Sequence, residues 1–242
     1  SNSLVKDFDY YVDRCVKLVQ GVIDTYLNYF IYTMLIGVFL NLIHTQILSQ
    51  LFFNFYFILF IILGAFLFVF SVYVLLIYMS GFKGFKNVLK NLISPIVIGG
   101  AAMSSSLAIP LNIKATKSNT NDESYSNFII PTLTNIHLVG DTITVSIINI
   151  LVLLFFNFEM PDVYTILLFS LYTALYNFSS VGVSGGGIII LYPVLVHVFG
   201  YSTEMLNMAT SLYILLDMFG TTGNIIFNNL LSVLLHYLYK KI

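Results

Sequence analysis

The chain of 242 residues is 58% hydrophobic and only 9% charged, a composition that excludes an ordinary soluble domain and favours an α-helical protein that crosses a membrane several times. Its formal net charge of −1 offers no basic surface for nucleic acid. The single cysteine, Cys15, excludes an intramolecular disulfide and a thiolate metal cluster, and no pattern indicates a resident cofactor.

The first third of the chain is expected to contain an amphipathic segment followed by two spans. Residues 1–25 carry scattered charges, whereas residues 26–47 and 51–80 are long apolar runs joined by an uncharged turn. The next apolar segment, residues 87–113, is interrupted by Ser104, Ser105 and Ser106. Residues 114–127 then form the only clearly polar loop.

The rest of the chain contains a third predicted span at residues 127–157, a second interrupted segment at 163–199 and a fourth span at 203–239. An irregular backbone in hydrocarbon leaves polar groups unpaired unless protein or water covers it, so two interrupted segments point to the binding site of a secondary transporter. Glycines at the second interruption would let it bend as a gate: Gly182, Gly185, Gly186 and Gly187.

The lysines and arginines predict the topology. They cluster at residues 6–17, 83–90, 114–117 and 240–241. If both interrupted segments are re-entrant hairpins of opposite orientation, all ten basic residues lie on the cytoplasmic side, as the positive-inside rule expects. The predicted fold is therefore an all-α polytopic membrane protein with four spans and two re-entrant helical hairpins, with both termini cytoplasmic and residues 87–242 as the transport core. The alternative, in which each interrupted segment is an ordinary helix pair or a single span, stays open.

Three motifs resemble, in order and spacing, those of the dicarboxylate/amino acid:cation symporters, the glutamate-transporter family. They are the run Ser104–Leu111, the run Phe128–Pro131, and Leu216-Asp217-Met218 followed by Thr221 and Asn224. The chain is similar to the C-terminal portion of that family, from about the fifth span onward. The resemblance implies either a homotrimer in the cell (inner) membrane or a partner chain that supplies the preceding spans.

The resemblance also implies substrate-binding residues. Asp217 would pair with the substrate's α-ammonium and Asn224 with its α-carboxylate, while Ser105, Ser106 and Thr221 would line the same site. Independently of the resemblance, an ionisable side chain at membrane depth is a functional candidate because burying it is costly. For Thr221, a role in packing between helices is an equal alternative.

Two departures from the family pattern concern the charge of the site. Gly220 stands where acidic-substrate members place an arginine, and Asp141 stands where the family's threonine faces the substrate side chain. A side-chain carboxylate on the substrate would lack its bidentate partner. We therefore expect a neutral or cationic amino acid rather than glutamate.

The expected cation-coupling site also departs from the family pattern, because His137, Val139 and Asn228 replace the family's asparagine and two aspartates. Sodium prefers several oxygen ligands, whereas His137 and Asp141, four residues apart on a regular helix, could move a proton. The candidates for sodium or proton coupling are His137, Asp141, Asn224 and Asn228. The sequence thus predicts a non-enzymatic symporter of amino acids or dicarboxylates that works by alternating access. The alternative is a non-transporting membrane subunit that retains the fold, and a passive channel is weaker because no ring of charges is visible.

Overall fold

The computed structural model describes residues 47–179 and 187–240, together with a few isolated earlier residues: Arg14, Tyr29, Thr33, Ile36, Gly37, Leu40, Ile43 and His44. Residues up to Gln46 and residues from Ile47 onward are separate units, and the second unit is described below. The expected amphipathic segment and first span, and three of the four gate glycines (Gly182, Gly185 and Gly186), lie outside the described ranges.

All elements within residues 47–179 and 187–240 are helices, as predicted. Three helical stretches there are long and apolar enough to cross a membrane. They are Tyr56–Ser80 within α3 (Ile47–Ser80), Glu123–Phe155 and Thr203–Tyr239, which is α10. They coincide with the second, third and fourth predicted spans.

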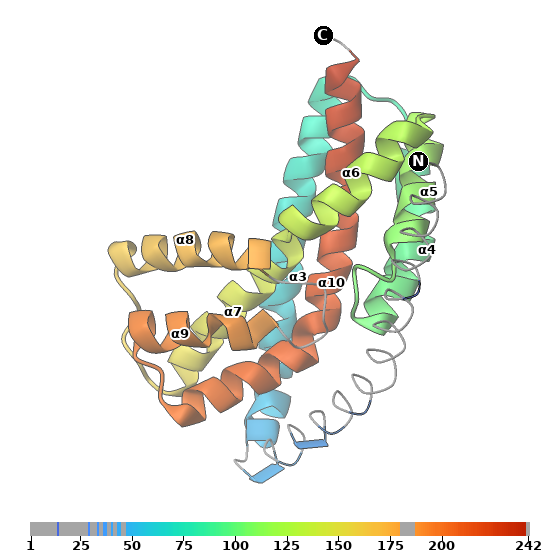
Figure 1. The fold of residues 1–242 in the computed structure, drawn as a ribbon. Helices are drawn as coiled ribbons and strands as arrows, with labels where there is room; N and C mark the ends of the chain where they lie inside the picture. Colours follow the sequence, from blue (N-terminus) through green and yellow to red (C-terminus); the bar gives the residue numbers. More distant parts are fainter. Residues whose placement is uncertain are drawn as a thin grey trace, which may run out of the picture. The chain divides into compact units, whose positions relative to one another are not determined.

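Helix α10 is the centre of this unit (Figure 1). It contacts α3, α4, α5, α6, α7 and α9. In the most apolar 18-residue stretch of each helix, the buried share is 67% for α10 and 11% for α3. Helix α3 therefore presents most of its surface outward. The core between them is apolar and includes Ile77, Leu92 and Phe227. Lipid tails are as apolar as these side chains, so close packing rather than transfer from water stabilises such contacts in a bilayer.

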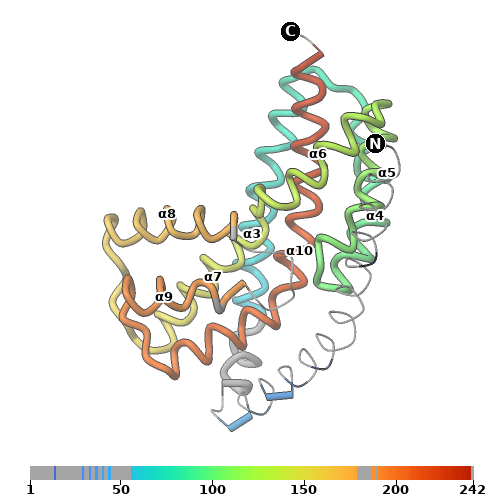
Figure 2. The backbone as a smooth tube through the Cα atoms, in the orientation of Figure 1, coloured from blue at the N-terminus to red at the C-terminus, as the bar shows by residue number. Residues whose placement is uncertain are grey.

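The two interrupted segments each form a pair of helices. The first helical pair is α4 (Phe85–Ala102) and α5 (Ile109–Thr120), and the second is α8 (Val163–Ser179) and α9 (Gly187–Phe199). The two members of each pair contact each other (Figures 1 and 2). Met103 ends α4 in the left-handed region at φ 49°, a conformation that turns the chain sharply. That each pair enters and leaves the membrane on one side stays a prediction.

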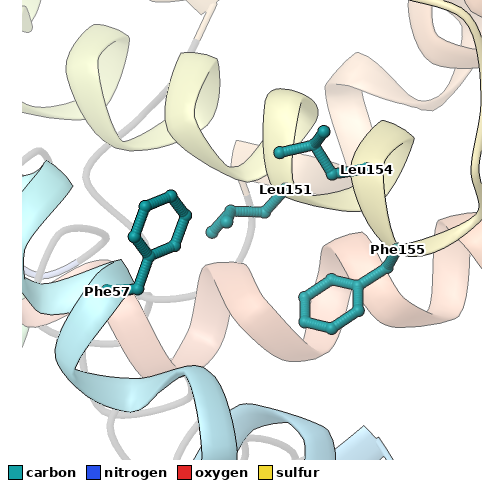
Figure 3. A pocket seen from close by; sticks show the side chains of 4 residues that line it. All are labelled: Phe57, Leu151, Leu154 and Phe155. Carbon is teal, nitrogen blue, oxygen red and sulfur yellow. The ribbon is translucent and has the colours of Figure 1, made fainter.

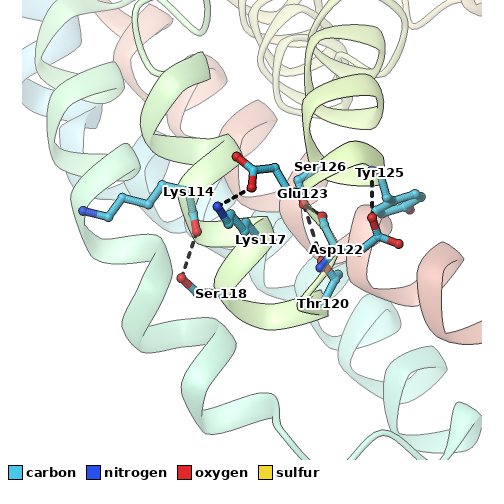
Figure 4. A network of polar contacts seen from close by, with 8 residues as sticks. All are labelled: Lys114, Lys117, Ser118, Thr120, Asp122, Glu123, Tyr125 and Ser126. Atoms are coloured by element: carbon cyan, nitrogen blue, oxygen red, sulfur yellow. Dashed lines mark hydrogen bonds and ion pairs between the residues drawn. The ribbon is translucent and has the colours of Figure 1, made fainter.

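The polar loop predicted at residues 114–127 is wrong for most of its length. Helix α5 continues to Thr120, and α6 (Glu123–Ile136) begins three residues later. Asn121 ends α5 at φ 54°, and the Asp122 side chain caps α6 by accepting a hydrogen bond from Tyr125 N. Lys117 and Glu123 form an ion pair of 2.6 Å across the turn (Figure 4). A left-handed backbone cap at Asn121 and a side-chain cap at Asp122 therefore replace a long loop with a tight turn.

Polar residues also join α5 to α10. Asn229 donates from Nδ2 to Asn112 Oδ1 at 3.0 Å and to Thr116 Oγ1 at 2.9 Å, and all three side chains are buried. Such mutually satisfied polar groups hold helices together in a bilayer. The polarity of α5 thus serves this contact.

Apolar pockets lie between helices of the described residues, and two of them are lined as follows. One, of about 260 Å³, lies between α3 and α7 (Val139–Phe155) and is lined by Phe57, Leu151, Leu154 and Phe155 (Figure 3). The other, of about 510 Å³, is lined by residues of α3, α4 and α10. Neither lining contains a titratable side chain, so the candidate site is built from the polar residues between α7 and α10.

Candidate functional site

The third predicted span is broken at its middle. Helix α6 ends at Ile136 and α7 begins at Val139, and the backbone of His137 (φ −124°, ψ 72°) and Leu138 (φ −99°, ψ 57°) is not helical. The predicted span keeps its position in the chain, but it consists of two helices. The prediction that His137 and Asp141 share one face of a regular helix is therefore wrong.

Asn224 of α10 holds the break in place. Its Oδ1 atom accepts hydrogen bonds from Gly140 N at 2.8 Å and Asp141 N at 3.2 Å. These amides belong to the first turn of α7, where backbone donors have no partner within the helix. Asn224 thus acts as an N-terminal cap supplied by a neighbouring helix, and α7 and α10 are fixed to each other.

Glycines allow the backbones of α7 and α10 to touch. A Cβ atom on Gly140 would lie 2.1 Å from Gly220 O and 2.6 Å from Asn224 N. A Cβ atom on Gly223 would lie 3.0 Å from Gly140 Cα. Only residues without a side chain fit this contact, as at other close helix crossings in membranes.

The two acids of the candidate site lie at this crossing and are buried. A Cβ atom on Gly220 would lie only 2.7 Å from Asp141 Oδ1, so the Asp141 carboxylate occupies the space beside Gly220. Asp217 precedes Gly220 by one turn, and Thr221 Oγ1 lies 3.5 Å from Asp217 Oδ1. The carboxyl groups of Asp141 and Asp217 are close enough to interact electrostatically. No lysine or arginine occurs between residues 118 and 239.

His137 contacts two other helices rather than Asp141. Its Nδ1 lies 2.6 Å from Asn228 Oδ1 on α10, and its Nε2 lies 2.7 Å from Tyr73 Oη on α3. An amide oxygen can only accept, so Nδ1 bears the proton and Nε2 accepts from the Tyr73 hydroxyl in the neutral ring. Sequence reasoning missed Tyr73 because it lies 64 residues from His137, among many other aromatic residues.

The serines of the first interruption are less closely tied to the site. Ser105 is half-buried and Ser106 is exposed. The first helical pair reaches α10 through glycines instead: a Cβ atom on Gly99 would lie 2.2 Å from Ile225 Cδ1, and one on Gly100 would lie 2.7 Å from Thr222 Oγ1. These contacts place the pair against the turn of α10 that contains Thr222 and Ile225. Among the described residues, no hydrogen bond joins Ser105 or Ser106 to Thr221 or Asn224.

The second helical pair reaches α10 at Gly187. A Cβ atom there would lie 2.0 Å from Tyr176 Oη and 2.4 Å from Tyr213 Oη. Gly187 was expected only to provide flexibility, whereas the structure shows that it fills a narrow space between two tyrosine hydroxyls. Neither tyrosine stands out in the sequence, since the chain contains 17 of them.

No group of three histidine, cysteine, aspartate or glutamate side chains able to hold a metal ion occurs among the residues described.

A broken span, paired shorter helices and buried carboxylates at the break are features typical of secondary transporters. The family model described as "Sodium:dicarboxylate symporter family" matches residues 3–238, and the chain belongs to that family. A search of curated proteins and a search of solved structures each found no match. Membership supports a membrane transport protein with a small-molecule substrate, rather than an enzyme.

Proposed function

We propose that this chain is a secondary active transporter of an amino acid whose side chain is neutral or cationic. The observation that supports it most is the contact between Asp141 and Gly220. By the resemblance, members of the family that carry acidic substrates have an arginine at the position of Gly220. Gly220 has no side chain, and the Asp141 carboxylate occupies the adjacent space. A substrate carboxylate at this point would meet a negative group instead of a guanidinium.

The roles of the other residues follow from their chemistry. Two buried carboxyl groups close to each other repel unless a cation or a proton compensates them. In the proposed complex, Asp217 accepts from the α-ammonium of the substrate and Asp141 faces its side chain. Asn224 uses its oxygen to cap α7, and its Nδ2 group lies within hydrogen-bonding reach of the Asp141 carboxyl. An amide nitrogen has two hydrogens, so the second is the donor that would meet the α-carboxylate.

We propose proton coupling at the cluster formed by Tyr73, His137 and Asn228. With Nδ1 donating to Asn228, a second proton on the imidazole must go to Nε2. The Tyr73 hydroxyl would then turn from donor to acceptor, which a rotatable hydroxyl can do without moving its ring. Histidine is the side chain suited to gaining and losing a proton near neutral pH.

Uptake into proteoliposomes tests the substrate proposal. Labelled L-alanine and L-lysine should enter, and L-glutamate should not. Asp217→Asn should abolish uptake, whereas Asp162→Asn, which removes an exposed carboxylate that caps α8, should preserve it. Preferential uptake of glutamate would contradict the proposal, and no uptake of any amino acid would support the non-transporting alternative.

Imposed ion gradients test the coupling proposal separately. An inward proton gradient should stimulate uptake in the wild-type chain and fail to do so in His137→Gln or Tyr73→Phe. Stimulation by a sodium gradient that is unaffected by these substitutions would show that the cluster is not the coupling site.

The predicted topology and assembly belong to the same proposal. Reporter fusions at the two ends should both report the cytoplasmic side of the cell membrane. A homotrimer, or a complex with a chain that supplies further spans, should appear as the mass of the particle purified in mild detergent. A monomer with transport activity would contradict the assembly part alone.

A further inference from the structure

The contact at Gly187 joins the second helical pair to α10 through tyrosine hydroxyls. Tyr176 of α8 and Tyr213 of α10 are both buried, and their hydroxyl oxygens are 3.5 Å apart. Gly187, the first residue of α9, lies so close that any side chain would collide with both hydroxyls. The start of α9 is therefore positioned by the two tyrosines.

Tyr213 also belongs to the face of α10 that bears the acids. It precedes Asp217 by four residues, one helical turn, so both side chains lie on one side of the helix. Its hydroxyl is close enough to Asp141 and Asp217 to interact electrostatically with both. Tyr213 thus lies between the second helical pair and the two carboxyl groups.

The end of α8 brings a second polar group to the same region. Asn177 donates from Nδ2 to Thr142 Oγ1 at 3.0 Å, and Thr142 directly follows Asp141 in α7. The Asn177 Oδ1 atom is buried, and it has no hydrogen-bond partner among the residues that the structure describes. Buried acceptors are nearly always paired because leaving one unpaired is costly.

We propose that Tyr213 and Asn177 are further substrate-binding residues, which complete the ammonium site on the side of the second helical pair. The inference rests on the proposed function. An ammonium group has three donors and no acceptor. Asp217, the Tyr213 oxygen and Asn177 Oδ1 supply three acceptors from two helices.

Equilibrium binding of labelled L-alanine and L-lysine to the purified full chain tests this inference. Tyr213→Phe keeps the ring that packs against Gly187 and removes only the hydroxyl. Asn177→Ala removes the unpaired acceptor. Each should raise the Kd about tenfold, the loss expected for one hydrogen bond to a charged group.

Tyr192→Phe is the matched control. The Tyr192 hydroxyl joins α9 to α10 through Thr210 Oγ1 at 2.5 Å. The substitution therefore removes another hydroxyl contact between the second helical pair and α10, at a position for which no interaction with Asp141 or Asp217 is found among the described residues. It should leave the Kd within about twofold of the wild-type value, since it meets no charged group. The melting temperature distinguishes a binding effect from a folding effect. Asn177→Ala loses the hydrogen bond to Thr142 but also removes a buried unpaired oxygen, so the two effects offset each other and the melting temperature should change little.

Each outcome decides between the explanations. Weaker binding in Tyr213→Phe and Asn177→Ala with an unchanged Tyr192→Phe supports the inference. Equal binding in all variants, or equal weakening in Tyr192→Phe, overturns it while the proposed function stands. If the wild-type chain binds neither amino acid, the proposed function fails and this inference falls with it.

Discussion

Replacing Gly220 by alanine perturbs the central contact of the site with a single methyl group. The new Cβ atom would lie 2.7 Å from Asp141 Oδ1 and 3.2 Å from Thr144 Oγ1, and the carboxylate must withdraw by about 0.7 Å to reach an ordinary contact of 3.4 Å. Asp141 lies in the first turn of α7, whose backbone is fixed by Asn224. The backbone of Asp141 can therefore take up little of that movement. Overpacking of this kind costs about 1–3 kcal/mol, and the better helix propensity of alanine returns about 0.5–1 kcal/mol.

The expected net loss is about 1–2 kcal/mol in the free energy of unfolding, measured by denaturant titration of the chain in detergent. In an Asp141→Ala background the obstructing carboxylate is absent, and Gly220→Ala should then cost little. The double-mutant cycle therefore isolates the contact between the two positions.

Gly64→Ala on α3 is the matched control, because a Cβ atom there meets nothing within 4 Å. It should be neutral or slightly stabilising through helix propensity alone. The reasoning is refuted if Gly220→Ala is tolerated as well as Gly64→Ala, or if its cost is the same with and without the Asp141 carboxylate.

Three further predictions concern the fold around the site. Asn224→Ala leaves two amides of α7 unpaired and should lower the free energy of unfolding by about 1–3 kcal/mol, measured by denaturant titration. Gly140→Ala places a Cβ atom against backbone atoms that cannot yield, so little folded protein should be recovered by size-exclusion chromatography. The pKa of Asp122 is held below its ordinary value chiefly by the Tyr125 backbone N–H. The folded state is therefore stabilised above that ordinary value, and this contribution is lost as the pH falls through the lowered pKa. The melting temperatures of wild type and Asp122→Ala should thus differ at neutral pH and converge in acid.

Controls for these variants come from the same helices. Asn135→Ala removes an exposed amide that bonds only within α6 and should be nearly neutral, so a similar loss there would remove the case for Asn224 as a cap. Full recovery of Gly140→Ala would show that α7 and α10 are less tightly packed than described. Parallel pH curves for wild type and Asp122→Ala would contradict the capping argument.

The sequence predicted the elements that depend on local composition. Long apolar runs predicted the three spans within the described residues, and the isolated acid Asp217 and the later Asn224 marked the polar face of α10. Hydropathy is a local quantity, so it also located the two interruptions by their serines and glycines.

Other features depend on contacts between distant residues. The break at His137 and Leu138 contains no proline or glycine, and it is fixed by Asn224, which lies 84 residues from Gly140. The position of Gly187 between the hydroxyls of Tyr176 and Tyr213 likewise requires three helices to come together. The polarity of the stretch around Lys117 predicts a loop, whereas in the structure α5 uses that polarity to bind α10.

The charge of the substrate site is the central claim, and competition for uptake tests it most directly. Labelled L-alanine uptake into proteoliposomes should be inhibited by excess unlabelled L-alanine or L-lysine and should be unaffected by L-glutamate. Asp141→Thr should weaken inhibition by lysine more than inhibition by alanine, because only lysine presents a second ammonium to that position. Inhibition by glutamate at least as strong as by lysine would contradict the claim.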